Sequence, residues 1–141
     1  MNNDTEIMAK TIYGEARGEY KKPNCGINSL IAVGNVIMNR HGESGESIEK
    51  VCLKPRQFSC WNDGDINRQL VLNPPIGDVI YILCLSVAQN LIDGKIKDIT
   101  NGANHYHSKN IKKIPHWAEG KNPVYSVGNH IFFRLYRPAV L

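Results

Sequence analysis

"GINSLIAVGNVIMNRHG", residues 26–42, is the stretch of the sequence that says most about the fold. Wound as a helix it carries a broad apolar face, and it closes with Arg40, His41 and Gly42, which are typical of a helix C-terminus. The apolar face consists of Ile27, Leu30, Ile31, Gly34, Ile37 and Met38. A face this wide predicts a central, mostly buried helix against which other segments pack.

Two other long helices are predicted around this one. Apolar residues recur at helical spacing from Thr5, with Asp4 or Thr5 as the N-cap, and this helix should run to about Gly18 before "YKKPN" breaks it. A similar pattern runs from about Gly77 to Asp93, and Gly94 ends it. The chain therefore begins as a helical protein.

The last third of the sequence has a different character. Unlike the earlier residues 47–52, which predict a short helix capped by Ser47, residues 101–123 are polar and aromatic without periodicity. This composition predicts a long functional loop. Residues 124–136, "VYSVGNHIFFRLY", are rich in strand formers around a Gly-Asn turn. Helices first and strands last predict a mainly helical α+β fold with a small C-terminal antiparallel hairpin or sheet.

Composition and charge narrow the class of protein. The chain has 141 residues, 42% hydrophobic and 21% charged, which suits one soluble domain with a real core. No apolar run approaches the roughly 20 residues of a membrane-spanning helix, and the polar, acidic N-terminus predicts no signal peptide. A formal net charge of +4 implies mild attraction to polyanions, whether nucleic acids, anionic membranes or bacterial wall polymers.

The four cysteines are Cys25, Cys52, Cys60 and Cys84, and their spacing contains no C-x-x-C motif. Together with a sequence that starts like a cytosolic product, this spacing predicts free buried thiols rather than a disulfide framework. Cys52 with Cys60 is the one pair to check for a bridge.

"IYGEARGEY", residues 12–20, places two glutamates one helical turn apart on one face, while Arg17 points about 200° away from Glu15. Gly14 and Gly18 each cost up to about 1 kcal/mol in a helix interior. Such residues predict that a substrate chain or a packed helix approaches the backbone closely, and a groove past Glu15 would explain both glycines.

A carboxylic acid can donate a proton near neutral pH if an apolar pocket and a neighbouring carboxylate raise its pKa. Glu15 follows Ile12 near the predicted edge of the core, with Glu19 one turn away. An ordinary amphipathic helix with solvated glutamates is the commoner interpretation of these residues alone.

Several motifs together resemble one family. "IYGEARGE", "AVGNVIMNRH", "QFSCWN", "HYHS" and "GNHIFF" follow the order and spacing of the SleB-type cell wall hydrolases, which include spore cortex-lytic enzymes and short phage-encoded relatives. The resemblance extends from about Ile7 to Phe133. It implies that residues 1–141 form a single catalytic domain with a lysozyme-like fold and no cofactor.

The activity that the resemblance implies is cleavage of the β-1,4 bond between N-acetylmuramic acid and N-acetylglucosamine in peptidoglycan. The family's catalytic carboxylate, the first glutamate of the motif, corresponds to Glu15. In a lytic transglycosylase this residue serves as acid and then as base. A hydrolytic muramidase instead needs a second carboxylate about 5 to 10 Å away, for which Glu19, Asp63 and Asp65 are candidates.

A sugar-binding groove should be lined by aromatic and hydrogen-bonding side chains. The candidates in this sequence are Phe58, Ser59, Trp61, Tyr106, His107 and Trp117. Tyr106 or Ser59 could also orient Glu15 or hold an N-acetyl group. Phe58 and Trp61 fit the core equally well, and Asn39 with Arg40 fits a structural helix end. The "CW" after Ser59 and the histidines of "NHYHS" depart from the family pattern.

Three alternatives stay open. A zinc-dependent peptidoglycan amidase or peptidase would use some of His105, His107, His116 and His130, although no H-E-x-x-H motif is present. Nucleic-acid binding through Lys109, Lys112 and Lys113 is disfavoured because no recognised reader motif occurs. An inactive relative that only binds the wall is the third.

The biological setting is predicted from length and from the N-terminus. A short chain with no signal peptide and no separate wall-binding module suggests a monomeric phage or prophage endolysin. Such a protein accumulates in the host cytoplasm and meets peptidoglycan strands once the membrane is breached. A spore location would fit a germination enzyme.

Overall fold

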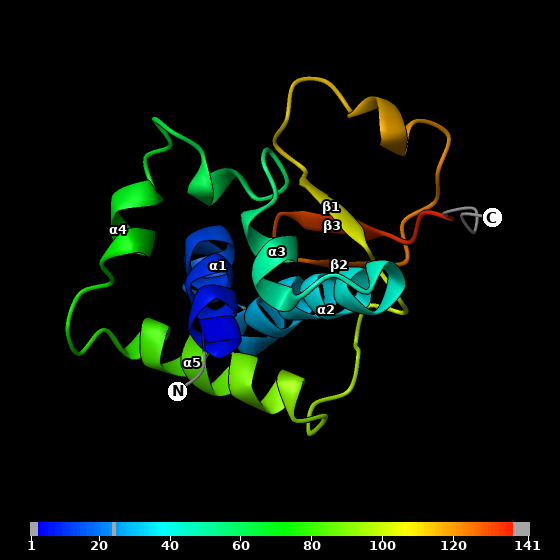
Figure 1. Ribbon diagram of the computed structural model, residues 1–141. Coiled ribbons are helices and arrows are strands. Elements are labelled where there is room, and N and C mark those ends of the chain that lie inside the picture. Colours follow the sequence, from blue (N-terminus) through cyan, green and yellow to red (C-terminus); the bar gives the residue numbers. More distant parts are fainter. Residues whose placement is uncertain (1–2, 24, 137–141) are drawn as a thin grey trace.

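The computed structural model describes residues 3–23 and 25–136. Figure 1 shows helices from the first two thirds of the chain beside a small sheet from the last third. The helices are α1 (Asn3–Tyr20), α2 (Gly26–Ser44), α3 (Ile48–Leu53), α4 (Arg68–Leu72) and α5 (Val79–Ile92), with 3-10 turns η1 (Ser59–Trp61) and η2 (His116–Ala118). The strands are β1 (His105–Ser108), β2 (Tyr125–Val127) and β3 (His130–Phe133). The predicted α+β class is confirmed.

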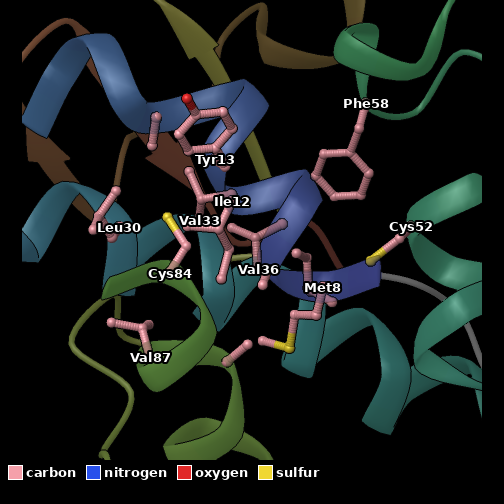
Figure 2. Close-up of a cluster of buried hydrophobic side chains, with 14 of the residues drawn as sticks. Met8, Ile12, Tyr13, Leu30, Val33, Val36, Cys52, Phe58, Cys84 and Val87 are labelled. Atoms are coloured by element: carbon pink, nitrogen blue, oxygen red, sulfur yellow. The ribbon is translucent and has the colours of Figure 1, made fainter. Parts of the chain in front are cut away.

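Helix α1 lies in the middle of the helical group and packs against α2, α3 and α5 (Figure 1). Because its apolar residues recur every three or four positions, one face points inward, and Met8, Ile12 and Ala16 are fully buried. Figure 2 shows Met8 and Ile12 among side chains from α2 and α5, such as Val33 and Cys84. The core therefore sits where these three helices meet.

Helix α2 is mostly buried, as its sequence predicts. Residues 32–37 are all buried, and a side chain at Gly34 would collide with Leu91 of α5 and come within 3.3 Å of Ile12 Cδ1. Glycine at this position lets the helices approach closely. Ile27 departs from the prediction, because it borders an open surface hollow and is 43% exposed.

Some predicted helix ends need correction. Helix α1 includes both Asp4 and Thr5, so neither is its N-cap; the Asp4 carboxylate instead accepts the backbone N–H of Glu49 at the start of α3, at 3.0 Å. Helix α2 continues past Gly42 to Ser44, and Gly45 takes the left-handed conformation that ends it. The Ser47 cap of α3 is confirmed, because its hydroxyl accepts the Lys50 N–H at 3.1 Å.

The sheet is antiparallel, with strand order β1-β3-β2. The predicted hairpin around the Gly-Asn turn is β2 and β3, in which Val127 pairs with His130. The predicted loop over residues 101–123 is wrong in part, because residues 105–108 form β1 and pair with the other side of β3. This pairing brings Tyr106 opposite Phe132, so residues near the start of the predicted loop form a wall of the site.

All four cysteines are free, and Cys52, Cys60 and Cys84 are buried. The Cys52 and Cys60 thiols therefore form no bridge. Among the helices of residues 3–23 and 25–136, none is long and apolar enough to cross a membrane.

Candidate active site

A cleft of about 390 Å³ opens between the C-terminal half of α1, the segment before η1 and the sheet. Its lining includes Glu15, Arg40, Arg56, Ser59, Tyr106 and His130. Among the described residues that line it, Glu15 is the only one with a carboxylate. The cleft therefore runs past the acid to which the sequence points.

The Glu15 carboxylate is held by donors from two distant segments. Tyr106 on β1 donates its hydroxyl to Oε1, in a short contact. The backbone N–H of Cys60 donates to Oε2 at 3.0 Å, and the Ser59 hydroxyl reaches the same oxygen at 3.4 Å. Because both oxygens accept hydrogen bonds, the carboxylate has a fixed orientation at the cleft wall.

Tyr106 is positioned by the sheet. Its ring lies 4.9 Å from the ring of His130 and 5.3 Å from that of Phe132, between centroids. Burial and the adjacent Glu15 carboxylate raise the pKa of Tyr106 well above its usual value. The phenol therefore keeps its proton and acts as a donor to Glu15 at any physiological pH.

Gly14 explains how η1 comes so close to Glu15. An added Cβ at Gly14 would lie 2.5 Å from Val71 Cγ2 and 2.6 Å from Cys60 Cβ. The Trp61 indole N–H also donates to Thr11 Oγ1 at 2.9 Å, which fastens η1 to α1. The predicted close approach is therefore made at Gly14 by the chain itself, whereas a Cβ added at Gly18 would have no described atom within 4 Å.

Arg17 turns away from the catalytic candidate, as its position on the helix predicts. Its Nη2 donates to Asn67 Oδ1 at 2.8 Å, and its guanidinium lies 5.7 Å from the centre of the Tyr13 ring. Among the ion pairs formed by the described residues, none involves Glu15. The Glu15 interactions found among the described side chains are therefore the hydrogen bonds from Tyr106, Ser59 and the Cys60 N–H.

Glu19 does not line the cleft. Its carboxylate accepts the backbone N–H of Asn129 at 3.2 Å and pairs with the Lys22 ammonium at 3.1 Å. Burial alone would raise the pKa of Glu19, but the Asn129 N–H, Lys22 and nearby His130 together hold it below its usual value. Glu19 thus joins α1 to the β2–β3 turn and stays ionised.

The two aspartates of the aromatic turn also lie outside the cleft lining. The side chain of Asp63 is 96% exposed and pairs with Arg68 at 3.4 Å. The Asp65 carboxylate accepts the backbone N–H of Asn67 at 2.8 Å. Neither residue is brought beside Glu15 in this conformation.

The predicted sugar contacts divide into two groups. Ser59, Tyr106 and His107 line the cleft. Phe58 is only 1% exposed, so its ring belongs to the core, and Trp61 packs against the core beside it. The core interpretation therefore fits these two aromatic side chains.

Trp117 lies on η2 and does not line the cleft, but it contacts a residue that does. Its ring is 5.8 Å from that of His107 and 5.5 Å from that of Phe133, between centroids. His107 in turn stacks on Phe133 at 5.3 Å. Trp117 therefore packs against His107, which lines the cleft, without lining the cleft itself.

Sequence reasoning did not place Arg40, Arg56 or His130 in the cleft, nor the other lining residues Gln57, Asn67, Ser108 and Ile111. Arg40 joins α2 to the segment before β1, since its Nε donates to the Asn104 carbonyl at 2.7 Å, and it also lines the cleft. His130 is 9% exposed, its Nδ1 atom has no hydrogen-bond partner among the described residues, and burial lowers its pKa. The alternation of "HIFF" could have placed His130 on the same face as Phe132.

A second hollow, of about 890 Å³, lies at the surface where α1, α2 and α5 meet. Residues such as Tyr20, Lys22 and Leu83 line it, and its described lining contains no carboxylate. Although this hollow is larger, its described lining offers no acid, so the Glu15 cleft is the better candidate for the active site. Within the described residues, no three of His, Cys, Asp or Glu are grouped so that they could share a metal ion.

A mainly helical domain with a small antiparallel sheet and one carboxylate in the cleft between them has the architecture of the lysozyme-like class. The structure resembles the catalytic domain of the Bacillus cereus SleB protein, with a TM-score of 0.69 and 25% identity over 94% of this chain and 90% of that one. The family model for Cell Wall Hydrolase matches residues 26–133, and the chain belongs to this family.

Other relatives cover α1 as well. The catalytic domain of the germination-specific lytic transglycosylase SleB from Bacillus anthracis shares the fold, with a TM-score of 0.68, 24% identity and coverage of 95% of this chain and 96% of that one. The spore cortex-lytic enzyme of Bacillus subtilis is 28% identical over 93% of this chain. The matched region is 37% of that enzyme, so the chain spans about a third of its length.

Proposed function

We propose that this chain is a peptidoglycan-cleaving enzyme that breaks the β-1,4 bond between N-acetylmuramic acid and N-acetylglucosamine. The observation that carries the proposal is the Glu15 carboxylate, held by Tyr106 and the Cys60 N–H at the wall of a cleft. The Cell Wall Hydrolase family and the spore cortex-lytic relatives support the same substrate.

Glu15 acts twice in the proposed reaction. Its carboxylic acid first protonates the glycosidic oxygen, and the bond from that oxygen to the muramic C1 breaks. The resulting carboxylate then accepts the proton of the muramic C6 hydroxyl while the C6 oxygen bonds to C1 and closes a 1,6-anhydro ring. The proton lost in the first step is regained in the second, so Glu15 is regenerated.

The lytic transglycosylase route needs one carboxylate, whereas ordinary hydrolysis uses two that lie about 5 to 10 Å apart. Among the described lining residues, Glu15 alone has a carboxylate, which favours ring closure over attack by water. The Tyr106 hydroxyl and the Cys60 N–H would stabilise the carboxylate that forms between the two steps.

Digestion of purified peptidoglycan followed by mass spectrometry tests this mechanism. Transglycosylation yields anhydro-muropeptides one water lighter than the hydrated products, and hydrolysis by a muramidase yields reducing ends. Free peptides without glycan cuts would point to the amidase alternative. No released product of any kind would favour an inactive wall-binding relative.

The Glu15→Gln variant gives the direct test of the assigned residue. It should fold normally and lose cleavage by several orders of magnitude, because an amide can neither donate nor accept the proton. Circular dichroism and thermal unfolding of the variant serve as the control. Full turnover by a verified Glu15→Gln protein would reject the assignment.

The biological setting is part of the proposal. The named relatives are spore cortex-lytic enzymes, which supports action on the spore cortex. Release of a monomeric phage endolysin from the host cytoplasm onto the wall stays the other prediction. Lysis of vegetative cells compared with germinating spores would separate the two substrates.

A further inference from the structure

The cleft carries positive charge beyond what acid–base chemistry at Glu15 requires. Arg40 and Arg56 line it together with Glu15, the only acidic residue in its described lining. Arg40 is fixed in place, because its guanidinium donates to the Asn104 carbonyl and to Gln57 and lies 5.0 Å from the Phe58 ring centre. Arg56 has none of these restraints.

Arg56 has an unusual backbone conformation. Its φ of 64° is in the left-handed region, which favours glycine, and only Asn101 shares a positive φ among the other described non-glycine residues. Asparagine tolerates this conformation through local hydrogen bonds, but arginine has no such compensation. An arginine at this turn therefore lowers stability relative to glycine, and its backbone conformation gives no reason for an arginine here.

The Arg56 side chain has no partner among the residues that the structure describes. It is exposed, and within residues 3–23 and 25–136 it makes no hydrogen bond or ion pair. Its planar guanidinium can grip a carboxylate with two parallel hydrogen bonds, which a lysine ammonium cannot do. The loop after β1 adds to the positive electrostatic potential near the cleft. Lys112 and Lys113 are exposed there, next in sequence to Ile111, which also lines the cleft.

We propose that Arg56 is a specificity-determining residue that binds a carboxylate carried by the glycan strand in the Glu15 cleft. The inference rests on the proposed function and narrows its substrate class to strands whose muramic acid units present free carboxylates. In a unit that carries a peptide stem, the lactyl carboxyl is amide-linked to that stem and the free carboxylates belong to the stem; in a unit without a stem, the lactyl group itself carries the carboxylate. Both sources offer the same planar anion to the guanidinium.

Binding to uncleaved strands tests the proposal independently of turnover. The Glu15→Gln protein is titrated with soluble glycan strands in three forms: with their peptide stems, with all carboxylates converted to neutral amides, and with the stems removed so that only lactyl carboxylates remain. The expected result is about tenfold tighter binding of the stem-bearing strands than of the amidated strands. Tighter binding by the stem-free strands assigns the freed lactyl carboxylate, weaker binding assigns the stem, and equal binding means that the guanidinium accepts either carboxylate.

Variants of Arg56 are compared in the same Glu15→Gln background. Arg56→Asn keeps a side chain suited to the left-handed conformation but removes the charge, so it should bind carboxylate strands about tenfold more weakly and amidated strands equally well. Arg56→Lys should fall between the two. Arg134→Asn removes the same charge from an exposed residue outside the cleft lining and should leave the discrimination unchanged.

Two further measurements separate a failure of the Arg56 proposal from a folding defect and from a failure of the proposed function. Arg56→Gly should have an unchanged or higher Tm, because glycine adopts this φ freely, yet it should bind like Arg56→Asn. If the protein with Glu15 intact cleaves no strand but the discrimination persists, the proposed function fails while Arg56 stands as a carboxylate-binding residue. Tight, equal binding of all strands by Arg56→Asn and its parent would overturn the proposal.

Discussion

Glu15 and Tyr106 are separated by 91 positions in the chain, yet their side chains meet at the cleft wall. Because burial and Glu15 itself raise the pKa of Tyr106, the phenol stays protonated and can only donate in this pair. The Tyr106 donor at Oε1, together with the Cys60 N–H at Oε2, holds the carboxyl group in one orientation at the cleft wall. At the residue scale, Tyr106 is therefore a positioning residue for the proposed acid.

Tyr106→Phe should reduce cleavage by about 10- to 100-fold, because one hydrogen bond to a charged group is worth roughly 1.5–3 kcal/mol. The phenylalanine ring keeps the packing against His130 and Phe132, so stability should change little. The rate of muropeptide release measures the effect. Tyr125→Phe removes a hydroxyl elsewhere on the sheet and should leave the rate intact; equal losses in both variants would contradict a specific role for Tyr106.

Glu19 supplies a prediction about pH. Its pKa is lowered in the folded protein despite the opposing effect of burial, so it contributes stability that is present above the ordinary glutamate pKa of about 4.3 and is lost as pH falls through the folded value. Glu19→Gln should therefore lower the free energy of unfolding by about 1 kcal/mol at pH 7, and the difference from the parent should vanish in acid.

Urea unfolding at pH 7, 5 and 3 checks this behaviour, with cleavage measured alongside. Since Glu19 contacts Lys22 and Asn129 rather than the cleft, the variant should keep most of its activity. A loss of activity as complete as that of Glu15→Gln, without a loss of stability, would instead restore Glu19 as the second carboxylate of a muramidase.

Among the elements, the contact between α1 and η1 determines whether Glu15 receives the Cys60 N–H. Gly14→Ala places a methyl group against Val71 and Cys60, and overpacking of this kind costs about 1–3 kcal/mol. The displacement of η1 should also weaken the hydrogen bond to Glu15 and lower activity. Thermal unfolding and muropeptide release give the two readouts.

Gly18→Ala is the matched control on the same helix. Nothing lies within 4 Å of the added methyl group, so alanine should raise stability by about 0.5–1 kcal/mol through its better helix propensity. Activity should stay at the parent level. If Gly14→Ala behaved like Gly18→Ala, the close packing of η1 on α1 would not be what positions the site.

The sequence predicts elements well where burial follows a simple period. Helices α1, α2 and α5 each bury a recurrent apolar face, and the β2–β3 hairpin has strand formers around its turn. Strand β1 was not predictable in this way, because "HYHS" is polar and becomes a strand only by pairing with β3. Its role depends on a tertiary contact rather than on local preference.

The residues of the candidate site also divide into those that a local sequence pattern predicts and those that it does not. Glu15 stands out because its helix carries glycines and a second glutamate that ordinary helix preference does not require. The inward ring of Phe58 and the outward charge of Arg56 are two residues apart in an aperiodic turn, where no pattern tells which side faces the core. The geometry of that turn therefore had to come from the structure.

At the scale of the whole molecule, three of the four cysteine thiols are buried in the core. Cys52, Cys60 and Cys84 are buried, while Cys25 is partly exposed. Burial raises the pKa of both Cys52 and Cys84 to about 12, and it raises the pKa of Cys60 as well, with a contribution from Glu15. In the unfolded chain the same thiols ionise near pH 8.5.

This difference predicts how the whole fold responds to alkali. A thiol whose pKa is higher in the folded state stabilises the fold fully below the unfolded pKa, and that contribution is lost as pH rises toward the folded value. Each of the three buried thiols should therefore lower the free energy of unfolding by up to about 1.4 kcal/mol per pH unit above pH 8.5. Urea unfolding at pH 7.5, 8.5 and 9.5, with a reductant present, measures the slope.

Two alanine variants separate this effect from a general alkaline weakening. Cys84→Ala should be less stable than the parent at pH 7.5, because it leaves a cavity, but its stability should fall less steeply above pH 8.5 since one buried thiol is gone. Cys25→Ala removes a thiol that is partly exposed and serves as the matched substitution outside the core. A parent protein whose stability stays constant up to pH 9.5 would mean that the thiols ionise without unfolding, and hence that the core admits water around them.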